Sequence, residues 1–143
     1  MGAWREIMHV VTATVTSAPE LEAMRKLAWE GVYRQGDVEE VLEGIRDDEP
    51  LHVLARRGGP VVSRFEAMRR ELPDPVSDEL RGWARELDEL FAYHAMLLAC
   101  SLDLLAVSWR SERLREQQAR VGPLGPPGER LRGLARRLSA ACG

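Results

Sequence analysis

The chain has 143 residues, of which 45% are apolar and 30% are charged, and this composition predicts one soluble globular domain with its own core. The formal net charge of −3 gives no overall sign of nucleic-acid binding, although residues 101–143 hold 8 basic and 4 acidic side chains, against 12 and 19 in residues 1–100. Two cysteines, Cys100 and Cys142, are too few for a disulfide framework and favour a cytoplasmic location.

The first sixteen residues fit either a helix or a strand. The segment 10–16 (VVTATVT) alternates like a strand and is rich in β-branched residues. We nevertheless expect a helix, because one helical stripe holds the apolar residues Trp4, Ile7, Met8, Val11 and Val15. Arg5, Glu6 and His9 interrupt the apolar core that a signal peptide would need, so we expect none here.

Two further helices are predicted before the first long turn. Ser17 and Glu20 have the spacing of a capping box, which marks a helix start. This helix should end near Gly36, because glycine commonly terminates helices. The capping pattern recurs at Asp37, which should start a short helix that ends near Ile45.

Two short helices are also predicted in the next part of the chain. One occupies residues 51–57 and is stopped by Gly58-Gly59-Pro60, and the other occupies residues 61–72. The alternative is a β-hairpin made of strands 51–55 and 61–65.

The segment from Ser77 to Arg120 is the most informative part of the chain. Its 44 residues contain no proline and a single glycine, Gly82, and apolar residues recur at helical spacing throughout. One continuous helix of this length would reach about 66 Å, whereas a compact body of 143 residues is about 40 Å across. The helix must therefore bend, protrude or pack against a second copy, and the sequence leaves open whether it is continuous or kinked.

Between Leu90 and Trp109 this helix is apolar around most of its circumference, so it should be covered on more than one side. The upstream helices can cover one side. We expect a homodimer contact on the other side, with a C-terminal helix that folds back as the alternative. The predicted interface with a second copy or another protein partner consists of Trp83, Leu87, Leu90, Phe91, His94, Leu98, Leu102, Leu105 and Trp109.

The stretch from Leu90 to Trp109 is also long enough to span a bilayer. Asp103 lies near its middle, where an acidic residue costs about 2.5–3.5 kcal/mol on insertion scales. His94, Ser101 and Ser108 add further polarity. We therefore expect no membrane span.

The predicted fold is all-α. Residues 1–120 should form a bundle domain of shorter amphipathic helices around the long helix, which covers about residues 77–120. Residues 121–128 (VGPLGPPG) hold three prolines and three glycines and are predicted to form a linker. A basic amphipathic helix over residues 129–143 follows the linker.

Few side chains suggest chemistry. The residues that could act as acids, bases or nucleophiles, and so line a ligand pocket, are Tyr93, His94, Cys100 and Asp103. His94, Ser101 and Ser108 recur at seven-residue spacing, as a polar track for a ligand or as satisfied core residues.

Metal-binding patterns are weak in this sequence. It has no zinc motif, and the Glu-x-x-His pair Glu49 and His52 lacks the additional inward-facing glutamates that a di-metal bundle needs. We therefore expect no metal and no cofactor.

The C-terminal arginines are the candidate contacts for an anion or a nucleic acid. They are Arg110, Arg113, Arg115, Arg120, Arg130, Arg132, Arg136 and Arg137. The sequence favours a non-enzymatic helical interaction or regulatory subunit that self-associates through its long helix and binds a protein partner. The alternatives are an accessory nucleic-acid-binding subunit that uses these arginines, and a ligand-binding bundle or enzyme with a pocket around His94.

Overall fold

The computed structural model describes residues 2–106 and 112–143, and these residues form five helices and no strand. The prediction of an all-α bundle is therefore confirmed, and the alternatives of a strand near residue 10 and a hairpin after residue 51 are wrong. The helices are α1 (Gly2–Arg46), α2 (Leu51–Glu71), α3 (Asp78–Ala106), α4 (Glu112–Ala119) and α5 (Pro126–Cys142).

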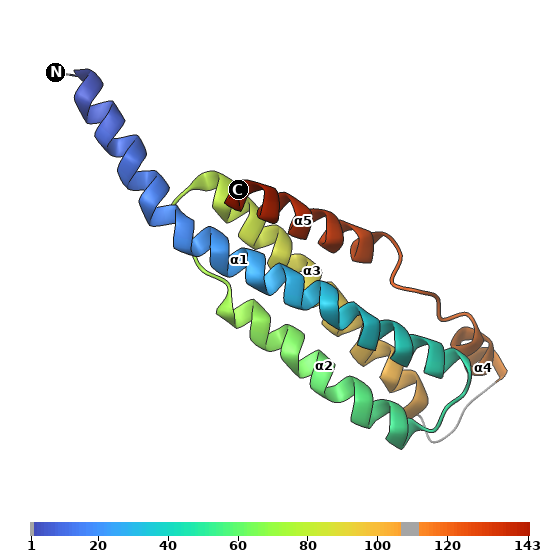
Figure 1. Cartoon of the computed structure of the whole chain (residues 1–143). Coiled ribbons are helices and arrows are strands. Elements are labelled where there is room, and N and C mark those ends of the chain that lie inside the picture. Colours follow the sequence, from blue (N-terminus) through green and yellow to red (C-terminus); the bar gives the residue numbers. More distant parts are fainter. Residues whose placement is uncertain (1, 107–111) are drawn as a thin grey trace.

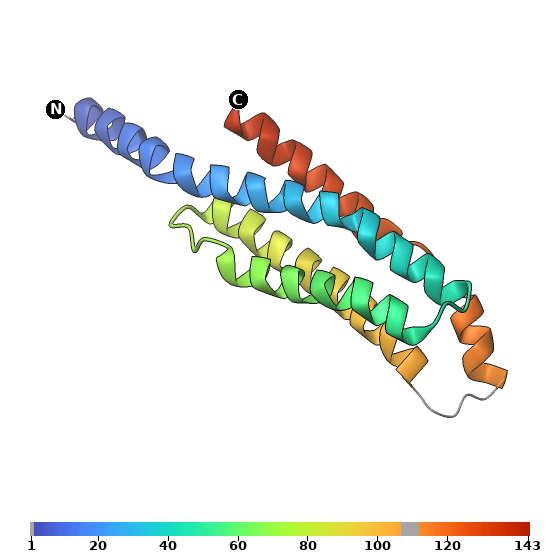
Figure 2. The same cartoon turned by 60° about the horizontal axis from the view of Figure 1, so that its bottom comes forward.

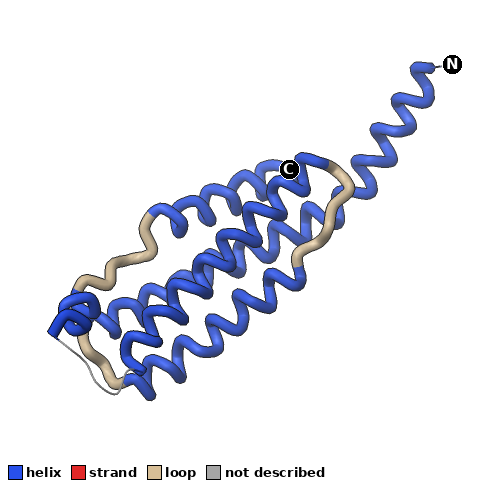
Figure 3. The backbone as a smooth tube through the Cα atoms, turned by 180° about the vertical axis from the view of Figure 1, so that it is seen from behind, coloured by secondary structure: helices blue, strands red, loops and turns tan. Residues whose placement is uncertain are grey.

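Four of these helices, α1, α2, α3 and α5, run alternately up and down in one bundle (Figures 1 and 2). α1 and α3 pack against each other, and both also pack against α2 and α5. α2 and α5 lie on opposite sides of the α1–α3 pair (Figure 1). The short helix α4 lies at the end of the bundle where α1 finishes, and loops join the helices only at the two ends (Figure 3).

The apolar faces of these four helices form one core. At its centre the ring of Phe65 on α2 lies 5.9 Å from the ring of Phe91 and 5.2 Å from that of His94, both on α3. The larger side chains that are fully buried are Met24, Leu42, Ile45, Leu54, Phe65, Met68, Leu87, Phe91, Leu98, Leu131, Leu134 and Leu138. Burial of each such side chain contributes about 1.5–3 kcal/mol, so the core dominates the stability of the fold.

α5 belongs to this core. Leu131, Leu134 and Leu138 are fully buried against the other helices, which matches the alternative in which the C-terminal helix folds back onto the bundle. The helix begins at Pro126, so the connection is shorter than the predicted linker 121–128. The connection is also anchored, because Leu124 is buried and its backbone N–H donates to Glu39 Oε1 at 3.0 Å.

The long helix expected over residues 77–120 is two helices in the structure. α3 ends at Ala106 and α4 begins at Glu112. Gln118 holds α4 at the end of α1, because its buried Nε2 donates to the Ile45 carbonyl and to Asp48 Oδ1, both at 2.9 Å. That carbonyl belongs to the last turn of α1, where the helix itself offers no donor.

The longest helix is instead α1, which spans 45 residues and therefore about 68 Å. The predicted helix start at Ser17 and the predicted break at Gly36 are both wrong, because α1 runs through them and through Pro19. Past Gly36, buried residues such as Val38 and Leu42 keep the helix in the core, and tertiary packing outweighs the low helix propensity of glycine.

α2 is also one helix rather than two. It continues through Gly58, Gly59 and Pro60, which were expected to stop it. The physical reason is packing: a Cβ at Gly58 would lie 3.0 Å from Leu102 Cδ1, so the missing side chain lets α2 approach α3 closely. Leu54 and Val61 on either side are buried, and their burial outweighs the backbone hydrogen bond that Pro60 cannot make.

Candidate functional site

The residues predicted to form a dimer interface are core residues of the single chain. Leu87, Leu90, Phe91, His94, Leu98 and Leu105 are buried, and Trp83 and Leu102 pack against the core while half-buried. Trp109 lies outside the described residues. In the described part of the stripe, α3 packs against α1, α2 and α5 of the same chain. The oligomeric state itself stays a prediction.

The four predicted pocket residues do not come together. His94 is buried, whereas Cys100 and Asp103 on the same helix are exposed. Tyr93 is half-buried and its ring touches the edge of the His94 ring, with centroids 6.2 Å apart. Of the other residues on the predicted polar track, Ser101 is buried and Ser108 lies outside the described residues.

The predicted basic surface is spread along the bundle. Arg113, Arg115 and Arg120 are exposed at the α4 end, and Arg110 lies outside the described residues. Arg130, Arg136 and Arg137 are exposed on α5, and Arg132 is half-buried.

Acidic side chains neutralise part of the charge on α5. Arg137 Nη2 lies 3.3 Å from Glu86 Oε1, and Arg130 Nη2 lies 4.0 Å from the same oxygen. Arg132 pairs with Glu129 on its own helix. Charges that already have partners are less available to phosphates, so α5 is a weaker anion surface than its sequence indicates.

The structure does join two of the predicted residues, His94 and Arg132, through a third that the sequence did not single out. Gln35 on α1 is buried, and its Nε2 lies 3.1 Å from His94 Nε2 on α3 and donates to the Gly128 carbonyl at 3.1 Å. Arg132 Nη1 on α5 donates to Gln35 Oε1 at 3.0 Å. We call Gln35, His94 and Arg132 the polar cluster.

The hydrogen bonds of the polar cluster assign the protonation state of His94. Its Nδ1 lies 2.6 Å from the Leu90 carbonyl, so Nδ1 carries the proton and donates it. Because Arg132 donates to Gln35 Oε1, the amide of Gln35 must present its N–H groups to His94, and His94 Nε2 must accept. Burial lowers the pKa of His94 below its usual value and Arg132 adds to this effect, although the Leu90 carbonyl and Glu39 oppose it.

A surface hollow of about 670 Å³ lies beside the polar cluster, at the start of α5. Arg132 lines it together with Glu39, Pro123, Pro126 and Arg130. Residues of the connection between α4 and α5, such as Pro123 and Gly125, also line it, and its charged groups include both signs. The hollow therefore has no strong preference for either an anion or a cation.

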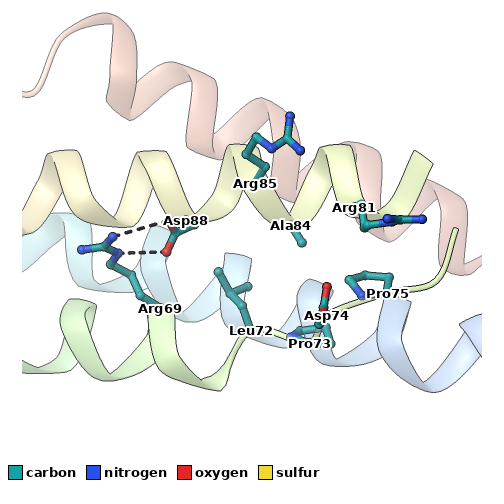
Figure 4. Close-up of a pocket in the computed structure, with 9 residues that line it drawn as sticks. All are labelled: Arg69, Leu72, Pro73, Asp74, Pro75, Arg81, Ala84, Arg85 and Asp88. Carbon is teal, nitrogen blue, oxygen red and sulfur yellow. Dashed lines mark hydrogen bonds and ion pairs between the residues drawn. The ribbon is translucent and has the colours of Figure 1, made fainter. Parts of the chain in front are cut away.

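A second hollow of about 270 Å³ lies where α2 turns into α3 (Figure 4). Three arginines line it, but Arg69 donates to both carboxylate oxygens of Asp88, at 2.9 and 3.4 Å, and Arg81 donates to the Val76 carbonyl. Arg85 points away from Asp74 in Figure 4. The three guanidinium groups therefore do not converge on one point where an anion could sit.

α3 is long and apolar enough to cross a membrane by length and composition. The central helix of a soluble bundle has the same properties, and α3 packs against α1, α2 and α5. The expectation that no segment spans a membrane stays a prediction.

The N-terminal third of α1 leaves the bundle. Its ribbon continues beyond the ends of the other helices in every view (Figures 1, 2 and 3). We call residues 2–17 the arm; as a helix of 16 residues it is about 24 Å long. By helical periodicity Trp4, Ile7, Met8, Val11 and Val15 share one face of the sequence, and the opposite face holds Arg5, Glu6, His9 and Thr16.

The seam by which α1 enters the core shares only Ile7 with the apolar stripe of the arm. The buried positions of that seam alternate in spacing of four and three residues: Met24, Ala28, Gly31, Gln35, Val38, Leu42 and Ile45. The same alternation carried toward the N-terminus reaches Leu21, Ser17, Thr14, Val10, Ile7 and Ala3. This is the spacing by which one helix packs along another.

A search of protein-family models, of curated proteins and of solved structures with this chain finds no match in any of the three.

Two features of the candidate sites were missed by sequence reasoning. Gln35 was placed at a helix end, yet it occupies a core position of the regular spacing from Met24 to Ile45, and a polar residue in such a position is the signal that could have marked it. The arm was missed because Ser17 and Pro19 look like a helix start, and no local pattern shows that α1 runs through them.

Proposed function

We propose that the protein is a non-enzymatic helical interaction subunit that self-associates through the arm of α1. The observation that carries the proposal is that the arm continues as a helix beyond every other helix of the bundle (Figure 1). Its sequence places apolar residues at helical spacing. An apolar face in water is stabilised by burial, at about 25 cal/mol per Å² of surface removed from solvent.

The arm also needs a neighbour in order to stay helical. An isolated helix of 16 residues is marginal in water even when it is rich in alanine. Six of the seven residues 10–16 are β-branched, and β-branched residues have low helix propensity. A second helix packed along the apolar face supplies the free energy that intrinsic propensity does not.

A second copy of this chain is the occupant that the arm fits best. Closed two-fold dimers are the commonest assemblies, and in them the same patch contacts itself. Apolar residues of the arm alternate in spacing of four and three residues (Trp4, Met8, Val11 and Val15), which suits another helix rather than a flat lipid surface. The arm carries one basic and one acidic residue, Arg5 and Glu6, so it lacks the excess of positive charge that favours binding to anionic lipid.

Sedimentation equilibrium of the full chain tests the proposal. We expect a dimer at micromolar concentration, and we expect Ile7→Glu to shift it to monomer. Loss of one buried isoleucine costs about 1.5–3 kcal/mol. The loss occurs in both copies of a symmetric dimer, so the dissociation constant should rise about 100-fold or more.

His9→Glu is the matched control, because it adds a negative charge to the opposite face of the same helix. We expect this variant to remain dimeric. A wild-type chain that is monomeric at tens of micromolar would overturn the proposal, as would equal effects of the two substitutions. Binding to neutral lipid vesicles by a monomeric chain would assign the arm to a membrane surface instead.

The alternatives have less support. The nucleic-acid hypothesis depends on the C-terminal arginines. Three of them, Arg130, Arg132 and Arg137, already lie next to Glu86 or Glu129. The enzyme reading relies on His94, which makes hydrogen bonds through both ring nitrogens inside the core.

A further inference from the structure

In the polar cluster, side chains from three helices exchange hydrogen bonds, with Gln35 and His94 buried and Arg132 half-buried. Arg132 comes from α5, Gln35 from α1 and His94 from α3. Buried leucines of α5 also stabilise its docking on the other helices. At the surface, Trp29 Nε1 donates a hydrogen bond to Ser139 Oγ at 2.7 Å. The polar cluster is therefore the specific, directional part of the α5 docking site.

We propose that the polar cluster is a pH-sensitive switch. Protonation of His94 breaks hydrogen bonds of the cluster and releases α5 from α1 and α3.

The geometry leaves a protonated His94 without an acceptor. A proton on Nε2 would point at Gln35 Nε2, which is itself a donor 3.1 Å away. Rotation of the Gln35 amide would bring its oxygen to His94, but that oxygen accepts from Arg132, and the amide nitrogen also donates to the Gly128 carbonyl. Protonation therefore costs either the Gln35–His94 bond or, after rotation of the amide, the bonds of Gln35 to Arg132 and to the Gly128 carbonyl, so the docked state of α5 resists protonation.

The groups around His94 from every packed helix are consistent with this behaviour. From α5, Arg132 repels a second positive charge, and from α1, Glu39 attracts one at longer range. From α3, the Leu90 carbonyl accepts from Nδ1 in either state and the Tyr93 ring touches the imidazole edge. From α2, the Phe65 ring stacks on the imidazole and contributes no titratable group. Burial then adds a penalty for the charged ring, because the charge loses its water.

The undocked fraction of α5 should rise as the pH falls. Histidine in an undocked or unfolded chain has a pKa of about 6.5. The pKa of His94 in the docked state is lower, so docking is fully supported above pH 6.5 and weakens as the pH falls below that value. Each pH unit between the two pKa values should raise the undocked fraction about tenfold.

Hydrogen exchange of the full chain tests the proposal, with rates corrected for the intrinsic pH dependence of exchange. Between pH 7.5 and pH 5 we expect protection to fall about tenfold or more in residues 129–142, while residues 80–100 of α3 remain protected. Equal loss of protection in all helices would overturn the proposal, because it would indicate global unfolding. Unchanged protection in α5 would overturn it as well.

The variant Arg132→Gln distinguishes a pH-sensitive switch at His94 from a general loss of stability. Without the guanidinium, the Gln35 amide can rotate and accept from protonated His94, and one positive charge is removed. We therefore expect the pKa of His94, followed by NMR of its imidazole, to rise toward about 6.5. Arg136→Gln, an exposed arginine on the same helix, is the control and should leave that pKa unchanged. Equal pKa values in both variants would contradict the role given to Arg132.

Discussion

α1 and α3 both have apolar residues at helical spacing, but the other helices cover them to different extents. Both place apolar residues at helical spacing over many turns. α3 has 29 residues and is about 44 Å long, and its core face is buried from Leu80 to Leu105. α1 is about 68 Å long, and its N-terminal third extends past the other helices that the structure describes (Figure 1).

The difference shows that a helix is covered only as far as its neighbours reach. α2 has 21 residues and α5 has 17, which gives lengths of about 32 and 26 Å. Neighbours of this size can cover α3 along most of its length but cannot cover all of α1. The part of α1 that they leave is the part for which we propose a second copy.

One substitution in each helix tests most clearly whether α3 is packed within the chain and the arm is not. Phe91 is fully buried on α3 and packs against Phe65, so Phe91→Ala should lower the free energy of unfolding by about 3–5 kcal/mol. Val11→Ala in the arm should change the unfolding of the monomer by less than about 0.5 kcal/mol.

Urea denaturation measures both changes in the free energy of unfolding, at a protein concentration low enough to keep the chain monomeric. A large effect of Val11→Ala under these conditions would mean that the arm packs within its own chain.

The continuity of α1 is tested by Pro19→Ala. If a helix began at Ser17, Pro19 would occupy its first turn, where proline is tolerated. In a helix interior, proline costs about 3 kcal/mol relative to alanine, since it removes a backbone hydrogen bond. The continuous helix therefore predicts a gain in far-UV helical signal and slower amide exchange in residues 10–16.

Pro126→Ala is the control, because Pro126 stands in the first turn of α5. The same small response from both prolines would place a helix start at Ser17.

The class of the fold could be predicted from the sequence because apolar spacing is a direct consequence of burial. The core faces of α3 and α5 follow this spacing, and Leu87, Leu98, Leu131 and Leu138 lie where it places them. The boundaries failed where glycine and proline occur inside helices, as at Gly36 and Pro60. Local propensity at such positions is a small term beside the burial of the residues around them, and that burial depends on helices distant in sequence.

The candidate sites were less accessible to sequence reasoning. His94 and Arg132 were both named, but for separate roles, and nothing local indicates that Gln35 connects them across α1, α3 and α5. The apolar stripe on α3 was assigned to a dimer because the sequence does not show how much of it the chain can cover. Both features depend on the relative placement of helices, which periodicity alone does not give.

Two glycines on α1 give the smallest and sharpest test of where the helix is covered. A Cβ at Gly31 would lie 2.8 Å from Phe91 Cε1 and 3.2 Å from Leu131 Cδ2, whereas a Cβ at Gly36 would meet nothing within 4 Å. Gly31→Ala should therefore destabilise the fold by about 1–3 kcal/mol through overpacking. Gly36→Ala should stabilise it by about 0.5–1 kcal/mol, since alanine loses less conformational entropy in a helix.

Thermal unfolding of the two variants side by side measures this difference in sign. Because the two positions are five residues apart on one helix, they share intrinsic propensity and differ only in what surrounds them. Stabilisation by both substitutions would mean that α5 and α3 do not approach α1 as closely at Gly31 as the structure places them. Destabilisation by both would mean that a partner covers the exposed side of α1 at Gly36, and the surface for self-association would then extend beyond the arm.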